Sequence, residues 1–74
     1  LNHRFNLAMA EHFSSRLEGE FADLAGQVRA GFRLATGRYP SEMEQVQMVS
    51  FAREHGMANF CRLLFNLSEF VFLD

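Results

Sequence analysis

Residues 36–44 (TGRYPSEME) constrain the fold more than any other part of this sequence. Gly37 can adopt the left-handed conformation that ends a helix. Pro40 cannot continue that helix, and it restricts the residue before it to extended conformations. Ser41 then forms an N-cap, and Glu44, three residues later, completes a capping box. The segment therefore predicts that one helix ends here and that another begins after a tight turn.

The composition favours helices in the rest of the chain. Ala, Leu, Glu, Gln, Arg and Met are frequent, whereas the β-branched residues are four Val and one Thr. Nine of the 74 residues are Phe, and burying each one contributes about 1.5–3 kcal/mol, so a small core can form without disulfides. Since a chain of this length supports one core at most, we expect residues 1–74 to form a single helical domain.

Apolar residues that recur at spacings of three and four predict four helices. The expected helices are residues 3–17, residues 21–36, residues 41–55 and a fourth that begins near residue 57. Gly19 and Gly56 separate neighbouring helices in this scheme. The sequence therefore predicts an all-α fold, an array of about four short helices in an orthogonal or bundle-like arrangement.

Each predicted helix carries apolar residues that we expect to face the core. In chain order they are Phe5, Ala8, Met9, Phe13 and Leu17; Phe21, Leu24, Ala25, Val28, Phe32 and Ala35; Met43, Val46, Val49 or Ser50, and Arg53, with Phe51 and Ala52; and Phe60, Cys61, Leu64, Phe65 and Leu67. Gly26 and Gly31 lie inside the second helix. They indicate either the close approach of a neighbouring helix or a weaker helix.

Charge and composition argue against several classes of function. The net charge is −2, all seven basic residues are Arg, and they alternate with acidic residues rather than forming a basic stripe, so we expect no nucleic-acid partner. No run approaches the roughly 20 apolar residues of a membrane-spanning helix. The single cysteine permits neither an internal disulfide nor a cysteine-based metal site.

No constellation of residues indicates catalysis, a metal or a cofactor. His3, His12 and His55 lack the spacing of three or four residues that a helical metal pair needs. Cys61 lies in an apolar segment, where a cysteine is buried and inert rather than a nucleophile. No serine lies in a nucleophile elbow. We therefore expect a chain that is not an enzyme and that has no catalytic, cofactor-binding or metal-binding residues.

Arg38 has two interpretations. Its guanidinium could bind Glu44 or Glu69 bidentately, which would make it a structural clamp between the turn and the C-terminal segment. Alternatively, it could bind an external anion. The clamp is the interpretation we favour, and it places Arg38 with Gly37, Pro40, Ser41 and Glu44 as structural residues of the turn and cap.

The closing run Phe70, Val71, Phe72 and Leu73 is apolar on every side. One helical turn cannot direct all four side chains at the same core. The run could pack under the first helix and close the domain. It could instead be a docking surface for the rest of a larger protein or for a second copy of the chain.

Several of these segments resemble one family. The segments occur in this order: Leu1-Asn2 with Phe5, then Phe32-Arg33-Leu34-Ala35 before Gly37-Arg38 with Pro40 and Glu44, and finally residues 61–64, Asn66 and residues 68–74. Together they resemble the C-terminal part of a planctomycete domain family of unknown function. The family often has Trp where Phe60 stands here. The resemblance covers nearly the whole chain, and its most specific parts are the Gly-Arg-x-Pro turn and the closing run.

The resemblance implies a location rather than a reaction. Members of the family occur in large proteins beside cytochrome c-type domains, so this chain would be the C-terminal helical fragment of a larger, exported protein, outside the cytoplasm. Our first hypothesis is a non-catalytic packing or interaction module that contacts other domains of its parent or a second copy. The alternative is one wall of an enzyme or redox site, to which Arg38, His55 or Cys61 would contribute.

Overall fold

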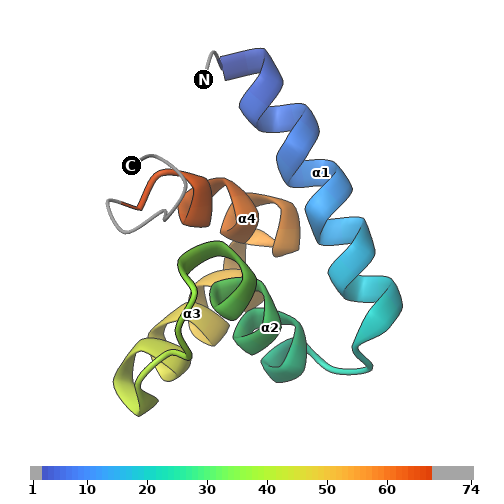
Figure 1. Cartoon of the computed structure of the whole chain (residues 1–74). Helices are drawn as coiled ribbons and strands as arrows, with labels where there is room; N and C mark the ends of the chain where they lie inside the picture. Colours follow the sequence, from blue (N-terminus) through green and yellow to red (C-terminus); the bar gives the residue numbers. More distant parts are fainter. Residues whose placement is uncertain (1–2, 68–74) are drawn as a thin grey trace.

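The structure is a computed structural model that describes the backbone of residues 3–67 and the side chains of residues 7–67. It contains four helices, α1 (His3–Glu20), α2 (Leu24–Thr36), α3 (Glu42–His55) and α4 (Met57–Phe65), and no strand within the described residues (Figure 1). The predicted all-α array of four short helices is therefore confirmed. The apolar run Phe70, Val71, Phe72 and Leu73 lies outside the described residues.

The break between the first two helices lies later than predicted. α1 continues through Gly19 to Glu20, where Arg16 Nε donates a 2.9 Å hydrogen bond to the Glu20 carboxylate one turn ahead. α2 begins at Leu24 because Asp23 is its N-cap. The Asp23 backbone is extended, and its carboxylate accepts a 2.8 Å hydrogen bond from the Gly26 N–H. A local cap therefore decided the boundary, and the prediction of Gly19 as the break was wrong.

α2 and α4 form the centre of the array. Each of them contacts all three other helices, and α1 makes its most extensive contacts with α4. In Figure 1, α1 and α3 lie on opposite sides of this central pair. The connection between α3 and α4 is a single residue, Gly56, whose positive φ of 89° lets the chain change direction at once.

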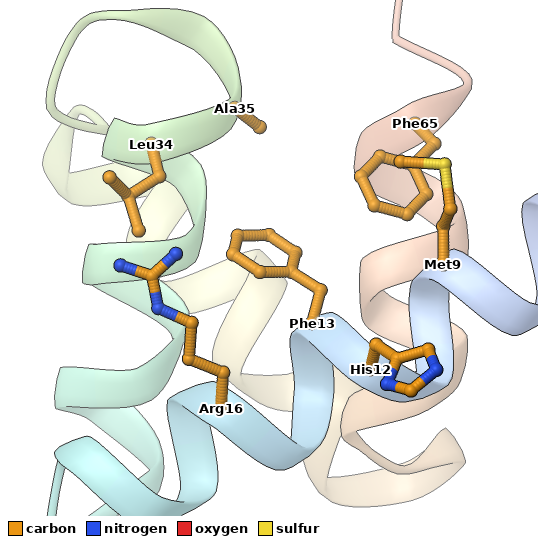
Figure 2. A pocket seen from close by; sticks show the side chains of 7 residues that line it. All are labelled: Met9, His12, Phe13, Arg16, Leu34, Ala35 and Phe65. Carbon is orange, nitrogen blue, oxygen red and sulfur yellow. The ribbon is translucent and has the colours of Figure 1, made fainter.

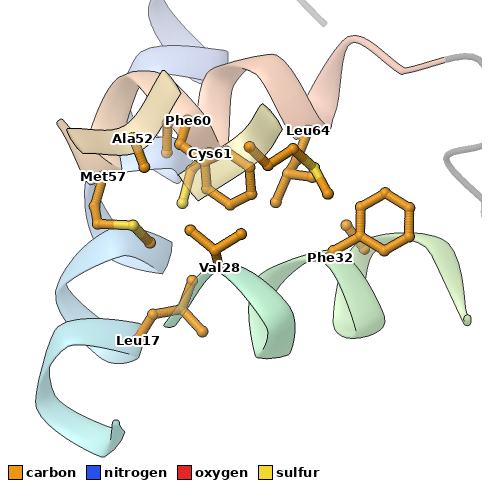
Figure 3. Packing of buried hydrophobic residues seen from close by; sticks show 11 residues of the cluster. Leu17, Val28, Phe32, Ala52, Met57, Phe60, Cys61 and Leu64 are labelled. Carbon is orange, nitrogen blue, oxygen red and sulfur yellow. The ribbon is translucent and has the colours of Figure 1, made fainter. Parts of the chain in front are cut away.

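The core fills the space where α1, α2 and α4 meet (Figure 3). Its largest fully buried side chains are Phe32, Phe60, Leu17, Leu64, Val28 and Cys61. At its centre is Gly31: a Cβ at this position would lie 2.9 Å from Leu17 Cδ1, 3.5 Å from Leu64 Cδ1 and 3.6 Å from Phe60 Cε2. Of the two explanations for this glycine, the structure supports the close approach of neighbouring helices.

The predicted core face of α1 was partly wrong. Ala10, Ser14 and Leu17 are buried, whereas Ala8 is exposed and Phe13 only half-buried. Ala10 and Ser14 have small side chains, and the Ser14 hydroxyl donates a 3.0 Å hydrogen bond to the Glu11 carbonyl. A count of large apolar residues could not find this stripe, because small residues form it.

Predictions for α2 and α3 need a similar correction. Phe21 precedes α2 and is partly exposed, while Met43 and Val46 of α3 are 72% and 69% exposed. α3 packs against α2 and α4 through another side, where Met48 and Ala52 are buried. A helix at the edge of a small array buries only one of its apolar faces. For α4, the structure confirms burial of the predicted residues Phe60, Cys61 and Leu64.

We predict that Gly31→Ala destabilises the fold by about 1–3 kcal/mol, because the added Cβ would overlap Leu17, which is fully buried and has little room to move. Urea unfolding followed by circular dichroism measures this change. Gly19→Ala is the matched control: it also lies in a helix, nothing lies within 4 Å of the added Cβ, and we expect a gain of about 0.4–1 kcal/mol. Equal effects at the two positions would contradict the argument.

Candidate functional site

The turn between α2 and α3 has the geometry that the sequence predicts. Gly37 adopts the left-handed conformation (φ 84°), and its N–H donates to the Arg33 carbonyl at 3.0 Å. The capping box is complete, since the Glu44 N–H donates to Ser41 Oγ at 3.1 Å and the Ser41 N–H donates to Glu44 Oε1 at 2.9 Å. Pro40 lies in the non-helical segment between the two caps. These residues end α2 and start α3 through local hydrogen bonds alone.

Arg38 clamps this turn through the same carboxylate. Its Nη1 and Nη2 donate to the two oxygens of Glu44, each at 2.9 Å, and its guanidinium carbon lies 4.7 Å from the centroid of the Phe32 ring. Of the two carboxylates considered as partners of Arg38, Glu44 forms the bidentate pair in the structure. Glu69 lies outside the described residues. The hydrogen bonds from Arg38, and next from the Ser41 N–H, lower the pKa of Glu44 from 4.5 to about 2.

Of the three residues named for an enzyme or redox site, Cys61 does not reach the surface. Cys61 is fully buried in the core, and burial, followed by the negative charge of Glu18, raises its pKa to about 12. His55 is exposed at the end of α3, where its ring lies 4.6 Å from that of Phe51. A buried thiol with a high pKa is inert. In the folded chain, Cys61 is therefore inaccessible, whereas His55 and Arg38 are exposed.

Two further features were sought among the described residues, a cluster of metal ligands and a helix able to span a membrane. Nowhere in residues 7–67 do three His, Cys, Asp or Glu side chains gather closely enough to hold a metal ion. Within the described part of the chain, none of the helices combines the length and the apolar character that crossing a membrane requires. The search for a functional site therefore turns to surface shape and charge.

A groove runs along the outer side of α1 and α2 and reaches the end of α4; we call it the α1–α2 groove. It consists of two adjoining hollows that share Arg16 and Leu34. The first, of about 490 Å³, is the apolar half, and Figure 2 shows the Phe13 side chain at its centre, between α2 and α4. The Phe13 and Phe65 rings stack at 5.9 Å between centroids. Met9 and Ala35 complete the apolar lining.

The second hollow, of about 440 Å³, is the cationic half of the groove. Three of the seven arginines in the chain, Arg16, Arg29 and Arg33, line it beside Tyr39. The Arg29 and Arg33 guanidinium carbons lie 4.1 Å and 5.3 Å from the centroid of the Tyr39 ring, which holds both side chains in place. Of these three arginines, Arg16 is the one with an ion-pair partner among the described residues, Glu20, at 2.9 Å.

The groove was not predicted, although part of it has a signal in the sequence. Arg29 and Arg33 are four residues apart and so lie on one helix face. Tyr39 could not be assigned to them, because only the turn after Gly37 brings it back over α2. The expectation of interspersed charge was therefore too simple, since folding gathers three arginines on one side of a chain whose net charge is −2.

Comparison of the chain with protein-family models, curated proteins and solved structures found no match. The resemblance to the planctomycete family accordingly stays a prediction. The functional argument rests on the turn, the core and the α1–α2 groove.

We predict that Glu44→Gln lowers the urea midpoint at neutral pH and that this difference shrinks as the pH falls. Because the folded-state pKa of Glu44 is depressed, its contribution is fully present above the unfolded value of 4.5 and is lost from about pH 5 to pH 2. Urea midpoints at several pH values measure the effect. Glu42→Gln, which removes a charge from the same helical turn, is the control. A difference between Glu44→Gln and wild type that stays constant down to pH 2 would contradict this account.

We predict that the Cys61 thiol resists labelling in the folded chain. A pKa of about 12 instead of 9.0 lowers the thiolate population at pH 8 on the order of 1000-fold, and burial excludes the reagent as well. The measurement is the rate of reaction with a chromogenic disulfide, with and without urea. Cys61→Ser combined with Ser50→Cys moves the thiol to an exposed position and should react rapidly. Rapid labelling of the unmodified chain without urea would overturn the prediction.

Proposed function

We propose that this chain is a non-catalytic helical interaction module that binds a protein segment in the α1–α2 groove. The described helices bury an apolar core of their own, and Phe13 and Phe65 of the groove pack against its edge. Leu34 and Tyr39 nevertheless remain about half exposed in it. Exposed apolar side chains grouped in a concave surface are typical of sites that bind proteins.

The observation that carries this proposal is the pairing of an apolar hollow with a cationic one. The stacked rings of Phe13 and Phe65 offer a platform for large apolar side chains. Next to it, the Tyr39 ring holds Arg29 and Arg33, and each guanidinium can donate to a carboxylate. The matching ligand is therefore a polypeptide segment that combines large apolar residues with Asp or Glu.

Placement in a larger, exported protein forms part of this proposal and rests on the family resemblance alone. In that setting the ligand would belong to another domain of the parent. The alternative, one wall of an enzyme or redox site, is weakened by the burial and raised pKa of Cys61. A second candidate is self-association through α3, favoured by the exposed side chains of Met43 and Val46.

Two synthetic peptides test the proposal. Both carry the same Phe and Leu residues, and one has Glu where the other has Lys. In an NMR titration of the complete chain, we expect the Glu peptide to shift resonances of Phe13, Leu34 and Arg33 saturably, and the Lys peptide to bind at least tenfold more weakly because its charges meet the arginines. Light scattering over a hundredfold dilution measures self-association in parallel.

Arg33→Gln should weaken binding of the Glu peptide about threefold to tenfold, because it removes one guanidinium from the cationic half. Arg53→Gln, an exposed position on α3, removes the same charge away from the groove and should leave the affinity unchanged. Equal binding of both peptides, or shifts confined to α3 around Met43 and Val46, would contradict the proposal. The second of these outcomes, together with a dimer in light scattering, would favour self-association.

A further inference from the structure

We propose that the cationic half of the α1–α2 groove is a subsite for a phosphate monoester carried by a side chain of the bound protein segment. This inference rests on the proposed function, because it uses the same groove. It goes further by naming the chemical class of the acidic group that the cationic half selects. It also adds regulation, since phosphorylation of the partner would strengthen the complex.

The first argument is the charge of the hollow. Arg16, Arg29, Arg33 and Glu20 line it, which leaves a formal charge of +2 in a chain whose net charge is −2. A carboxylate brings one negative charge, whereas a phosphate monoester brings about −1.5 to −2 at neutral pH. One phosphate monoester therefore balances the charge of the hollow, and one Asp or Glu side chain does not.

The second argument is the supply of hydrogen-bond donors. Arg16 uses its Nε for Glu20 at 2.9 Å, and its two terminal nitrogens form no hydrogen bond within residues 7–67. The guanidinium groups of Arg29 and Arg33 form neither a hydrogen bond nor an ion pair with any described residue, and both lie over the Tyr39 ring instead. The donors of three arginines are therefore available to one ligand.

The third argument is the direction from which these donors come. Arg29 and Arg33 lie one turn apart on α2, and the Arg16 side chain extends from α1 towards α2 (Figure 2). A planar carboxylate is satisfied by a single guanidinium, as Glu44 is by Arg38 at 2.9 Å to each oxygen. A phosphoryl group has three acceptor oxygens that point in different directions. It can therefore accept hydrogen bonds from arginines of both helices.

The fourth argument is the order of the arginines before a ligand binds. Two like charges repel each other, yet the guanidinium carbons of Arg29 and Arg33 lie 4.1 Å and 5.3 Å from the centroid of one ring, that of Tyr39. Side chains that are already positioned lose less conformational entropy on binding. Proteins recognise phosphorylated segments with arginine clusters of this kind.

The test adds two peptides to the Glu and Lys pair. One has phosphoserine in place of Glu, and the other has two adjacent Glu residues, which supply a similar charge without a phosphate. In NMR titrations of the complete chain at neutral pH, we expect the phosphoserine peptide to bind at least tenfold more tightly than the Glu peptide and at least threefold more tightly than the two-Glu peptide. The shifts should include Arg29, Arg33 and Tyr39. Equal affinity for phosphoserine and for two Glu residues would overturn the inference.

Three variants locate the subsite on the chain. Arg29→Gln should weaken binding of the phosphoserine peptide at least tenfold. Glu20→Gln removes the carboxylate that lines the hollow and should raise the affinity about threefold. The control, Glu18→Gln, removes the same charge from another side of α1, does not line the hollow and should change nothing. All three positions are exposed, so we expect the variants to fold. An unchanged affinity in Arg29→Gln, or equal effects at residues 18 and 20, would overturn the inference.

Inorganic phosphate separates a phosphorylated segment from a free ion as the source of the phosphate. We expect it to shift the same arginine resonances but to bind at least a hundredfold more weakly than the phosphoserine peptide, because it lacks the apolar residues that contact Phe13. Inorganic phosphate that binds as tightly as the peptide would overturn the assignment to a protein segment.

The failures of the two proposals can be told apart. If the Glu and phosphoserine peptides bind the groove equally well, the proposed function stands and the phosphate subsite is excluded. If no acidic peptide binds, the proposed function itself fails. Tighter binding of the phosphoserine peptide that Arg29→Gln abolishes supports both.

Discussion

Three helices of this protein meet at one backbone position. Leu17 of α1 occupies the space next to Gly31 of α2, and Phe60 and Leu64 of α4 close around the same point. A Cβ at residue 31 would lie 2.9 Å from Leu17 Cδ1, so its absence leaves room for the Leu17 side chain against α2. Phe13, one turn before Leu17, lines the α1–α2 groove and packs against the core.

The turn after Gly37 has a structural and a surface consequence. The carboxylate of Glu44 accepts hydrogen bonds from Arg38 and from the Ser41 N–H, so one ordered side chain joins Arg38 to the helix cap. The same turn carries Tyr39 back over α2, where the ring lies against Arg29 and Arg33. A change that relaxed the turn would therefore affect both the start of α3 and the cationic half of the groove.

The reactive thiol of this chain and the side chains suited to recognition lie in different parts of the structure. The Cys61 thiol is buried and has a raised pKa, so it is inert in the folded chain. The side chains suited to non-covalent recognition, aromatic rings and guanidinium groups, gather in the α1–α2 groove. This division supports the proposed interaction module.

The all-α class, the end of α2, the start of α3 and the burial of Phe60, Cys61 and Leu64 could be predicted from the residues alone. Caps and turns are predictable because their hydrogen bonds join residues within about four positions of each other. Tertiary structure decided that Ala10 and Ser14 are buried while Met43 and Val46 are exposed. It also decided that Arg16, Arg29, Arg33 and Tyr39 share one hollow. Which residues are buried and which share a hollow depends on how the helices pack, and packing brings together residues that are far apart in the sequence.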